Sequence, residues 1–211
     1  MKIVSLESVD STQKYLKKLI QKDSSLSALA VVADMQTDGI GSRNNSWRGM
    51  RGNLFLSFSW KLYNLPDDLK IESASIYFSY LLKETLSELG SEVWLKWPND
   101  FYIESSKIGG MITHVVGDIL VCGVGINLLY APEGFEKLDI EVQKEILLKK
   151  YFEKIEKKIL WKQVFSKYEL EFHKSKNYFT HNESMQIALN DATLSSDGSL
   201  LVNGKRVYSL R

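Results

Sequence analysis

The sequence predicts an α+β fold in which helices flank a mixed β-sheet and a small all-β appendage follows at the C-terminus. Strand-like segments cluster in the middle of the chain, amphipathic helical segments stand on either side, and two Asx-Gly turns lie near the end. We expect a main domain over residues 1–178 and a small β domain over residues 179–211.

The N-terminal part predicts a helix, a strand and a long loop. Asp10 or Ser11 can cap the free N–H groups of the segment TQKYLKKLIQK. Residues 28–36 (ALAVVADMQ) are typical of a buried strand. Residues 37–52 contain four glycines and no regular period, which indicates a functional or mobile loop. The apolar stripe of the helix consists of Tyr15, Leu16, Leu19 and Ile20.

The central part predicts more strands and one long helix. Residues 53–62 alternate as a strand with one apolar face does. A long helix is expected from about Asp67 to Leu89. Turn signals at Glu104–Ser106 and Gly117–Asp118 accompany three further strand segments. These are VWLKWPND (93–100), FYIESSKIGGMITHVV (101–116) and DILVCGVGINLLY (118–130).

The C-terminal third changes from helix to strand. From Asp139 to about Lys176 we expect helices with lysine and glutamate on the solvated side. Asp197–Gly198 and Asn203–Gly204 are then strong hairpin signals. The apolar side of the helical part would hold Ile146, Leu147, Phe152, Ile155, Ile159, Trp161 and Phe165.

Composition excludes several classes of protein. Hydrophobic residues make up 44% of the 211 residues, and the net charge of +1 gives no broad field for DNA or an anionic membrane. No segment approaches the roughly 18 apolar residues of a membrane span, and no signal peptide is evident. A single cysteine, Cys122, excludes an internal disulfide framework, and we expect a cytoplasmic protein. His114, His173 and His181 lack partners at ligand spacing, so we expect no structural zinc.

The most unusual stretch is KWPND, residues 96–100. A residue before proline is pushed toward extended backbone, which predicts that Trp97 belongs to a strand or its edge. The two-residue period of a strand would then place Lys96 and Asp100 on one side. We expect an opposite-charge pair aimed at one spot.

The segment VCGVGINL has two different faces under the same period. Two glycines on one face weaken a strand, and the usual reason to keep them is a bulge or a group lying close against the backbone, such as a ligand. The apolar core face holds Cys122, Val124, Ile126 and Leu128. The other face holds Val121, Gly123, Gly125 and Asn127.

The preceding segment KIGGMIT shows a similar feature. Its period places Lys107, Gly109, Met111 and Thr113 on one side, where Lys107 would address an anionic or carbonyl group. The alternative is a helix that crosses closely over the glycines, with Lys107 merely exposed. The two strands together favour a ligand.

The loop of residues 37–52 suits an anion. Its backbone N–H groups have few side chains in the way, and Arg43, Arg48 and Arg51 supply positive charge. Its pattern is neither a P-loop nor a dinucleotide-binding glycine motif.

Together these motifs resemble those of the biotin protein ligases, specifically the short class without an N-terminal DNA-binding domain. VDSTQKYL resembles the family's D-S-T-N segment, and ADMQTDGIGSRNNSW its biotinyl loop. KWPNDFY resembles the signature K-W-P-N-D, SSKIGGMI the K-[LI]-[AG]-G strand, and CGVGINL the G-[IV]-G-[IV]-N strand. The resemblance covers nearly the entire chain.

The resemblance implies a class II synthetase-like catalytic domain of the biotin/lipoate ligase type, followed by a truncated SH3-like β domain. It implies an AMP-forming biotin–[acetyl-CoA-carboxylase] ligase that uses ATP and Mg²⁺. Such an enzyme activates biotin as biotinyl-5′-AMP and transfers it to a lysine of a biotin carboxyl carrier protein. The first step joins two anions, so cations must neutralise charge at the reacting phosphate.

The resemblance also assigns site residues. Asp100 would hold Mg²⁺, orient the incoming amine or only fix Lys96, and these roles stay open. The loop would close over the adenylate and exclude water. The catalytic residues would be Lys96, Asp100, Lys107 and Arg43. Biotin would contact Ser11, Thr12, Gln13, Gln36, Gly39, Ile40, Gly41, Ser42, Lys107, Gly110, Gly123 and Gly125. ATP would contact Arg43, Trp47, Lys96, Asn99 and Asn127.

Two departures from the family pattern stand out. The biotinyl loop usually carries G-R-G-R-x-G-R, whereas residues 39–45 here lack the arginines expected at 40, 42 and 45. Arg43, with Arg48 or Arg51, would substitute for them. Gln13 replaces an asparagine and keeps an amide on a longer stem.

Two other functions fit part of the pattern. Lipoate or octanoate ligases and transferases share the architecture and the lysine strand, although KWPND favours biotin. The second alternative function is that of a ligase that also represses transcription. Against it, the first residues already belong to the catalytic pattern, and the charge balance indicates no DNA-binding surface. Exposed strand edges would suit a homodimer or transient pairing with the carrier.

Overall fold

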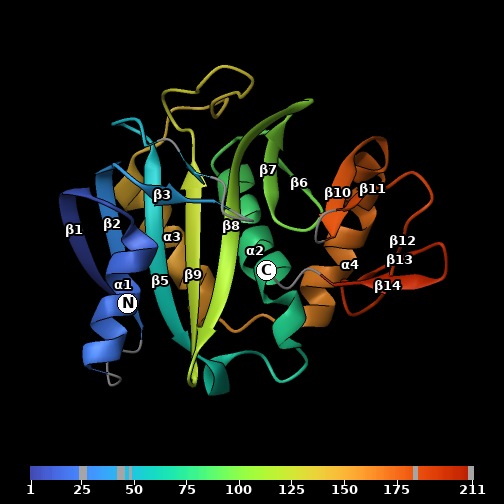
Figure 1. Cartoon of the computed structure of the whole chain (residues 1–211), viewed down its shortest axis with the longest axis horizontal. Coiled ribbons are helices and arrows are strands. Elements are labelled where there is room, and N and C mark those ends of the chain that lie inside the picture. Colours follow the sequence, from blue (N-terminus) through green and yellow to red (C-terminus); the bar gives the residue numbers. More distant parts are fainter. Residues whose placement is uncertain (24–27, 42–45, 48, 183–184, 209–211) are drawn as a thin grey trace.

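Strands from distant parts of the chain form one mixed sheet (Figure 1). The computed structural model describes residues 1–23, 28–41, 46–47, 49–182 and 185–208, and within these ranges the sheet has seven strands. Across the sheet they are β1 (Lys2–Val9), β2 (Leu29–Gln36), β5 (Leu54–Lys61), β9 (Ile119–Ile126), β8 (Ser106–Val116), β7 (Asp100–Ile103) and β6 (Trp94–Lys96). β1 and β2 are parallel and the other neighbours are antiparallel, which confirms the predicted mixed sheet.

Helix α1 (Thr12–Lys22) connects β1 to β2 and covers one face of the sheet. Ser11 is its N-cap: the backbone there is extended, and the side chain accepts the N–H of Lys14. The predicted capped helix is therefore confirmed. A small hydrophobic cluster lies between this helix and the strands, formed by Leu16, Ile20, Leu29, Val31, Ile119 and Val121.

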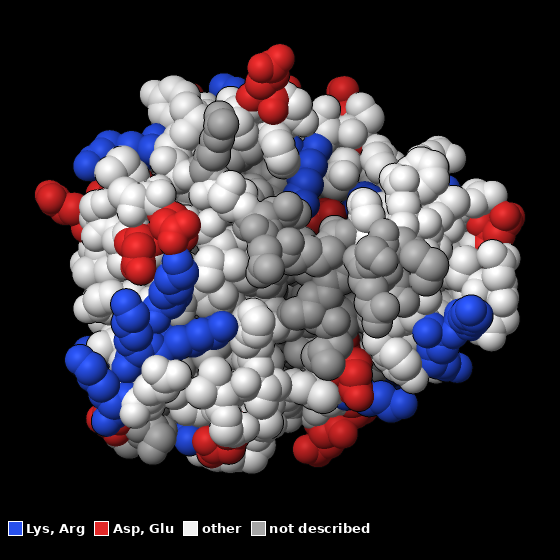
Figure 2. Space-filling model, in the orientation of Figure 1, with Lys and Arg blue, Asp and Glu red and all other residues white. Residues whose placement is uncertain are grey.

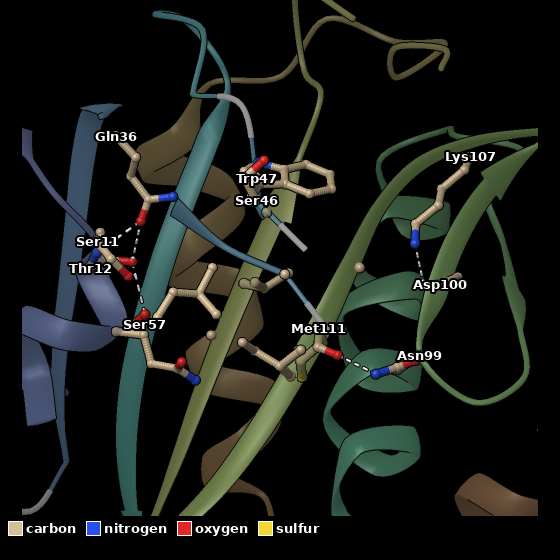
Figure 3. Close-up of a pocket in the computed structure, with 18 of the residues that line it drawn as sticks. Ser11, Thr12, Gln36, Ser46, Trp47, Ser57, Asn99, Asp100, Lys107 and Met111 are labelled. Carbon is tan, nitrogen blue, oxygen red and sulfur yellow. Dashed lines mark hydrogen bonds and ion pairs between the residues drawn. The ribbon is translucent and has the colours of Figure 1, made fainter. Parts of the chain in front are cut away.

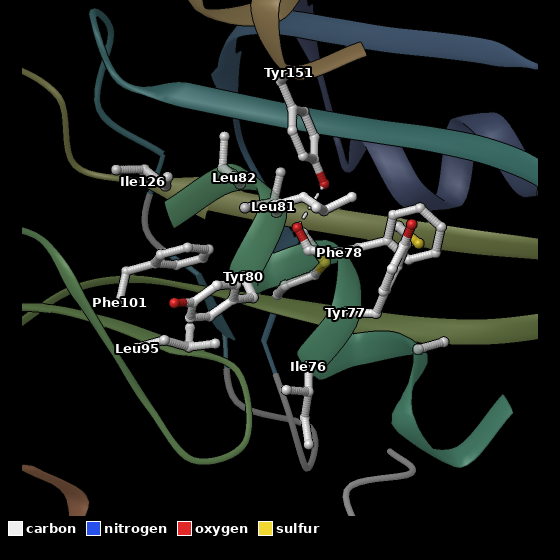
Figure 4. Packing of buried hydrophobic residues seen from close by; sticks show 14 of the residues in the cluster. Ile76, Tyr77, Phe78, Tyr80, Leu81, Leu82, Leu95, Phe101, Ile126 and Tyr151 are labelled. Carbon is white, nitrogen blue, oxygen red and sulfur yellow. Dashed lines mark hydrogen bonds between the residues drawn. The ribbon is translucent and has the colours of Figure 1, made fainter. Parts of the chain in front are cut away.

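The larger hydrophobic core lies on the opposite face of the sheet, under the other helices (Figure 4). Phe58 of β5 meets Phe78, Tyr151 and Phe152 edge to face, at ring-centroid distances of 5.4, 5.9 and 5.8 Å. The Tyr151 hydroxyl donates a hydrogen bond to the Phe78 carbonyl (3.0 Å), so it is paired despite its burial. The helices are α2 (Ala74–Glu88), α3 (Lys144–Glu156) and α4 (Trp161–Glu171).

The helix expected from Asp67 to Leu89 begins later, at Ala74, and that prediction of its start is wrong. The carboxylate of Asp68 accepts the backbone N–H groups of Trp161 (2.8 Å) and Lys162 (3.0 Å). These are free donors at the start of α4, so Asp68 caps another helix instead of joining α2. Two short 3-10 turns precede α2, Leu62–Asn64 and Ile71–Ser73.

The chain forms four strands where the sequence predicted three, because the turn at Glu104 and Ser105 divides the second segment into β7 and β8. Glu104 has a positive φ of 47° there. The turn at Gly117 and Asp118 lies between β8 and β9, as expected, and Gly117 has a φ of 60°. Both turns place their residues in the left-handed region that a tight reversal requires.

The helical region expected from Asp139 begins at Lys144 instead. The Asp139 carboxylate accepts the Ser91 hydroxyl (2.6 Å) and the Glu92 N–H (2.7 Å), which keeps it outside α3. Ile146, expected on the buried side, is 43% exposed. The buried apolar side chains of α3 are Leu147, Leu148, Tyr151, Phe152 and Ile155. The 3-10 turn Phe172–Asn177 follows α4.

Residues 37–52, which show no strand period, still contain a short antiparallel ladder. β3 (Gly39–Ile40) pairs with β4 (Ser46–Trp47), and Gly39 lies opposite Trp47. A Cβ at Gly39 would lie 2.7 Å from the Gln36 side chain and the Trp47 carbonyl, so this position requires glycine.

Short C-terminal strands confirm the expected small β appendage. Asn203 and Gly204 both have positive φ, as a two-residue hairpin turn needs. Leu200 and Val207 are buried in the same core as the main sheet. The division between residues 178 and 179 stays a prediction. The strands are β10 (Phe179–Asn182), β11 (Met185–Ala188), β12 (Thr193–Leu194), β13 (Leu200–Val202) and β14 (Lys205–Val207).

Candidate active site

A cavity of about 340 Å³ opens on the α1 face of the sheet, beside the first turn of α1 (Figure 3). Of the predicted site residues that the structure describes, three do not line this cavity: Gly39, Lys96 and Asn127. Ser42 and Arg43 fall outside the described residues, as does Arg48. The predicted site residues that line it are Ser11, Thr12, Gln13, Gln36, Ile40, Gly41, Trp47, Asn99, Asp100, Lys107, Gly110, Gly123 and Gly125.

One end of the cavity is lined by neutral polar groups. The N–H of Thr12 donates to the Gln36 side-chain oxygen (2.8 Å), and the Thr12 hydroxyl donates to the same oxygen (3.0 Å). The hydroxyls of Thr12 and Ser57 share a further hydrogen bond of 2.8 Å. The start of α1 is thereby tied to the end of β2 and the middle of β5, which makes this end of the cavity rigid.

Gln13 contributes an unpaired amide to this end. The residue is 3% exposed, and neither its side-chain oxygen nor its nitrogen has a hydrogen-bond partner among the described residues. A Cβ at Gly123 would lie 3.2 Å from that nitrogen, so the glycine makes room for it. A buried amide without partners is costly, and it points to a ligand that supplies both an acceptor and a donor.

The glycine face of β9 is confirmed, but part of what lies against it belongs to the chain itself. Gly123 and Gly125 face the α1 side, while Cys122, Val124 and Ile126 pack in the opposite core. The Trp47 indole lies over Gly125, where an added Cβ would come within 2.7 Å of the ring. The close approach predicted for a ligand at Gly125 is therefore made by Trp47, which forms one wall of the cavity.

Gly125→Ala should displace the Trp47 indole from β9. The added methyl overlaps the ring, and overpacking of this kind costs up to about 3 kcal/mol of stability. We expect a red-shifted tryptophan emission with little change in far-ultraviolet circular dichroism. In a Trp47→Phe background the same substitution should leave the emission unchanged, and a shift that persists there would contradict the packing described.

The predicted arrangement of β8 is wrong because of a β-bulge. Tyr102 of β7 pairs with Lys107, but Phe101 pairs with Gly109, so the register shifts by one residue. Lys107 therefore shares the cavity side with Gly110 and Ile112. Met111, which was expected beside Lys107, still borders the cavity but also belongs to the large core on the opposite face. The lysine and a glycine still border the same space, as Figure 3 shows for Lys107.

The other end of the cavity is charged and comes from KWPND. Lys96 and Asp100 share one side, as expected, but they do so as partners across the β6–β7 hairpin and not along one extended strand, because residues 97–99 form a turn. The Lys96 ammonium is 3.3 Å from one Asp100 oxygen, and the Lys107 ammonium is 2.6 Å from the other. Burial acts to raise the pKa of Asp100, but the two ammonium groups outweigh it, and the pKa lies below its ordinary value.

The rest of KWPND anchors this hairpin. The buried Trp97 donates its backbone N–H to the Ser175 hydroxyl (3.1 Å) and its indole N–H to the Gly198 carbonyl (2.9 Å). Its peptide bond to Pro98 is cis. The Asn99 amide donates to the Met111 carbonyl on β8. Lys96 and Asp100 therefore stand on a turn that the C-terminal segment and β8 both hold.

Asn127 holds a neighbouring loop and does not line the cavity. Its amide donates to the Glu136 carbonyl (3.1 Å), and its own carbonyl accepts the Leu138 N–H (2.7 Å). This loop presents Phe135 at the cavity, edge to face with Trp47 at 6.4 Å.

Sequence reasoning missed part of the lining. Ser57 lay on the polar face of the predicted strand 53–62, and that face could have indicated it. Phe135 carries no signal of its own, because only the fold of its loop brings it to Trp47. The residues missed are Ser46, Ser57, Met111, Ile112, Val124 and Phe135.

Comparisons with known proteins agree on one family. The biotin/lipoate A/B protein ligase family matches residues 5–128. The chain is 32% identical over 133 residues to the bifunctional ligase/repressor BirA of Escherichia coli. The aligned region covers 60% of this chain and 40% of that protein. The chain is 26% identical to the biotin–[acetyl-CoA-carboxylase] ligase of Mycobacterium tuberculosis over 51% of this chain and 42% of the other. The matches thus span about two fifths of the length of these relatives.

Solved structures agree over the full length. The biotin acetyl coenzyme A carboxylase synthetase of Helicobacter pylori, solved with bound biotinylated ATP, superposes with a TM-score of 0.93 at 36% identity, over 98% of this chain and 99% of that one. The biotin protein ligase of Aquifex aeolicus, in complex with biotin and ATP, has the same fold, with a TM-score of 0.77 at 22% identity over 100% and 96% of the two chains.

Proposed function

This chain belongs to the biotin/lipoate A/B protein ligase family, and we propose that it activates biotin with ATP and transfers the biotinyl group to a lysine of a carrier protein. First, a carboxylate oxygen of biotin attacks the α-phosphorus of ATP, and the bond to pyrophosphate breaks. Then the lysine amine attacks the acyl carbon of biotinyl-5′-AMP, an amide forms, and AMP leaves with the bonding electrons. The match to the Helicobacter pylori synthetase over nearly the whole chain supports this proposal.

The unpaired amide of Gln13 is the observation that favours biotin over lipoate as the substrate. The ureido ring of biotin offers a carbonyl acceptor and two N–H donors, which can satisfy both ends of this amide. The dithiolane ring of lipoate offers neither, so it would leave the amide buried and unpaired. The hydrogen-bonded Thr12, Gln36 and Ser57 beside it favour the same ligand.

Gln13→Leu tests this assignment directly. It keeps the side-chain volume but removes the donor and the acceptor, so the Kd for biotin should rise roughly tenfold to hundredfold, the cost of one or two lost hydrogen bonds in a buried site. Stability of the free protein should not fall, because an unpaired buried amide is removed. Titration calorimetry with biotin measures the first and thermal unfolding the second. A Kd within a factor of two of the wild-type value would refute the role of Gln13.

The charged end of the cavity suits the reacting groups. The biotin carboxylate and the α-phosphate must approach each other, and their mutual repulsion has to be offset by fixed cations. Lys107 lines the cavity and Lys96 stands behind Asp100, so the pair supplies this charge. In our proposal Asp100 holds both ammonium groups in place when no anion is present. Of the three roles that the sequence left open for Asp100, this is the one of fixing Lys96, extended to Lys107.

A protein-held Mg²⁺ does not fit the residues at this site. The Asp100 carboxylate is already occupied by two ammonium groups, and no group of three or more acidic, His or Cys side chains that could hold a metal occurs in the described part of the chain. Mg²⁺ keeps several waters and binds phosphates readily. In our proposal any Mg²⁺ therefore enters with ATP, and the protein contributes no dedicated cage.

The acceptor we propose is a biotin carboxyl carrier protein. Two of the similar proteins support this choice, because their names contain acetyl-CoA carboxylase. Homodimer formation and a cytoplasmic location remain predictions, as does the absence of DNA binding. In the described part of the chain no helix combines the length and the apolar character that a bilayer crossing requires.

A comparison of biotin with lipoate separates the proposed function from its closest alternative. Ligand that binds the folded state raises stability, by about 2.7 kcal/mol at a concentration of 100 times its Kd. We expect biotin with MgATP to raise the unfolding temperature clearly more than lipoate with MgATP. A larger shift with lipoate would support a lipoate ligase instead.

A further inference from the structure

Helix α1 carries four lysines and no acidic residue. We call Lys14, Lys17, Lys18 and Lys22 the lysine face. Among the described residues, Lys14 has a salt bridge, to Asp38, and the other three have none. Lys14, Lys18 and Lys22 follow one another at four-residue spacing, where like charges destabilise a helix. Within the described part of the chain only Lys14 of this row is compensated, so the remaining repulsion has a cost in folding, and contact with an acidic partner would offset that cost.

The lysine face stands out on the surface of the molecule. Figure 2 shows Lys and Arg side chains gathered over α1, on the same side as the cavity. The chain as a whole has a net charge of only +1, so this concentration is local. Lys18 and Lys22 are exposed, while Lys17 is partly buried, and burial lowers the pKa of Lys17.

The position of the lysine face ties it to the cavity. Ser11, Thr12 and Gln13, at the start of α1, line the cavity. An 11-residue helix is about 16 Å long, so the lysines extend from the cavity rim to about that distance. A protein whose lysine enters the cavity has to cover the rim. It therefore lies within reach of α1.

The surroundings of the lysine face argue against a membrane or a nucleic acid. The apolar side of α1 is used up in the protein, because Leu16 and Ile20 are buried under it, and no apolar face remains to enter a bilayer. Strong nucleic-acid binding needs many phosphate contacts, and one short helix in a nearly neutral chain supplies few. An acidic patch on a folded protein matches a compact row of lysines better.

We infer that the lysine face docks an acidic surface of the acceptor carrier domain and guides its lysine to the cavity. The inference rests on the proposed function. Charges at the edge of an interface act mainly by speeding association, and their effect weakens as salt screens them. The lysine face should therefore affect capture of the carrier and leave formation of the adenylate unchanged.

Two variants with equal charge change test the inference. Lys18→Glu with Lys22→Glu reverses the lysine face, while Lys149→Glu with Lys150→Glu makes the same change at exposed positions of α3, on the other face of the sheet. The acceptor is the carrier domain of acetyl-CoA carboxylase from the same genome. Hydroxylamine serves as a small acceptor that traps the adenylate as biotinyl hydroxamate without any docking. Circular dichroism checks that α1 stays folded, and Lys18→Gln with Lys22→Gln provides a milder version.

At low salt we expect the KM for the carrier to rise roughly tenfold in the α1 variant, with the α3 variant close to wild type. Hydroxamate formation should be equal in all three proteins. Added salt should raise the wild-type KM toward that of the α1 variant. An unchanged carrier KM in the α1 variant would overturn the inference, as would lysine-dependent binding to DNA or anionic vesicles without an effect on that KM. If the wild-type protein forms no hydroxamate, the proposed function itself fails.

Discussion

Lys107→Ala should lower the rate of biotinyl-adenylate formation by about two to three orders of magnitude, the usual effect of removing one group that stabilises developing charge. Among the residues that the structure describes, Lys107 is the only lysine or arginine that lines the cavity, and its ammonium group is held by Asp100 at 2.6 Å. Single-turnover release of pyrophosphate measures this step.

Biotin binding provides the internal control for this variant. The polar end of the cavity, with Gln13 and Thr12, remains intact, so the Kd for biotin should change far less than the rate. Lys61→Ala removes a lysine that pairs with Asp118 and does not line the cavity, and it should leave the rate unchanged. A Lys107→Ala rate within threefold of wild type would show that this ammonium does not act on the reacting groups.

Asp100→Asn should lower the free energy of unfolding by about 2–4 kcal/mol at neutral pH, since removing one partner of a largely buried ion pair leaves the other charge uncompensated. The Asp100 side chain is 22% exposed, and the Lys96 and Lys107 side chains are 9% and 29% exposed. Two ammonium groups would then face each other across a neutral amide. Denaturant unfolding measures the change. Asp118→Asn should have a much smaller effect, because the Asp118 side chain, which pairs with Lys61, is 63% exposed.

The effect of Asp100→Asn should depend on pH in a definite direction. The pKa of Asp100 in the folded protein is lowered from the ordinary value of 3.8. A lowered pKa means that the ionised carboxylate stabilises the folded state above 3.8 and that this stabilisation is lost as the pH falls through the lower folded value. The difference between wild type and variant should therefore be constant from about pH 5 to 8 and narrow below about pH 4. A difference that grew on acidification would contradict the ion-pair geometry.

Local signals in the sequence predicted much of the site. The Ser11 cap set the start of α1, and the period of KWPND placed Lys96 and Asp100 on one side, although the chain reverses between them in a hairpin that the period did not predict. The paired glycines of β9 indicated a face with a close neighbour, and Gln13 and Trp47 are that neighbour. Each of these signals depends on a few adjacent residues, so the sequence contains what is needed to recognise it.

The errors arose where distant residues decide the structure. Asp68 is not helical because it caps α4, which lies far along the chain. The bulge in β8 comes from pairing with β7, and the period of KIGGMIT alone gives no sign of it. Trp47 covers Gly125 only because the β3–β4 ladder carries it there. Such long-range pairings are not encoded in any local pattern.

The most direct test of the proposed function is the mass of a biotin carrier domain after incubation with this protein, biotin and MgATP. We predict an increment equal to biotin less one water, on the acceptor lysine, that disappears when ATP is omitted or when lipoate replaces biotin. An unchanged carrier mass under these conditions, with a folded protein and a carrier that another biotin ligase can modify, would contradict the account.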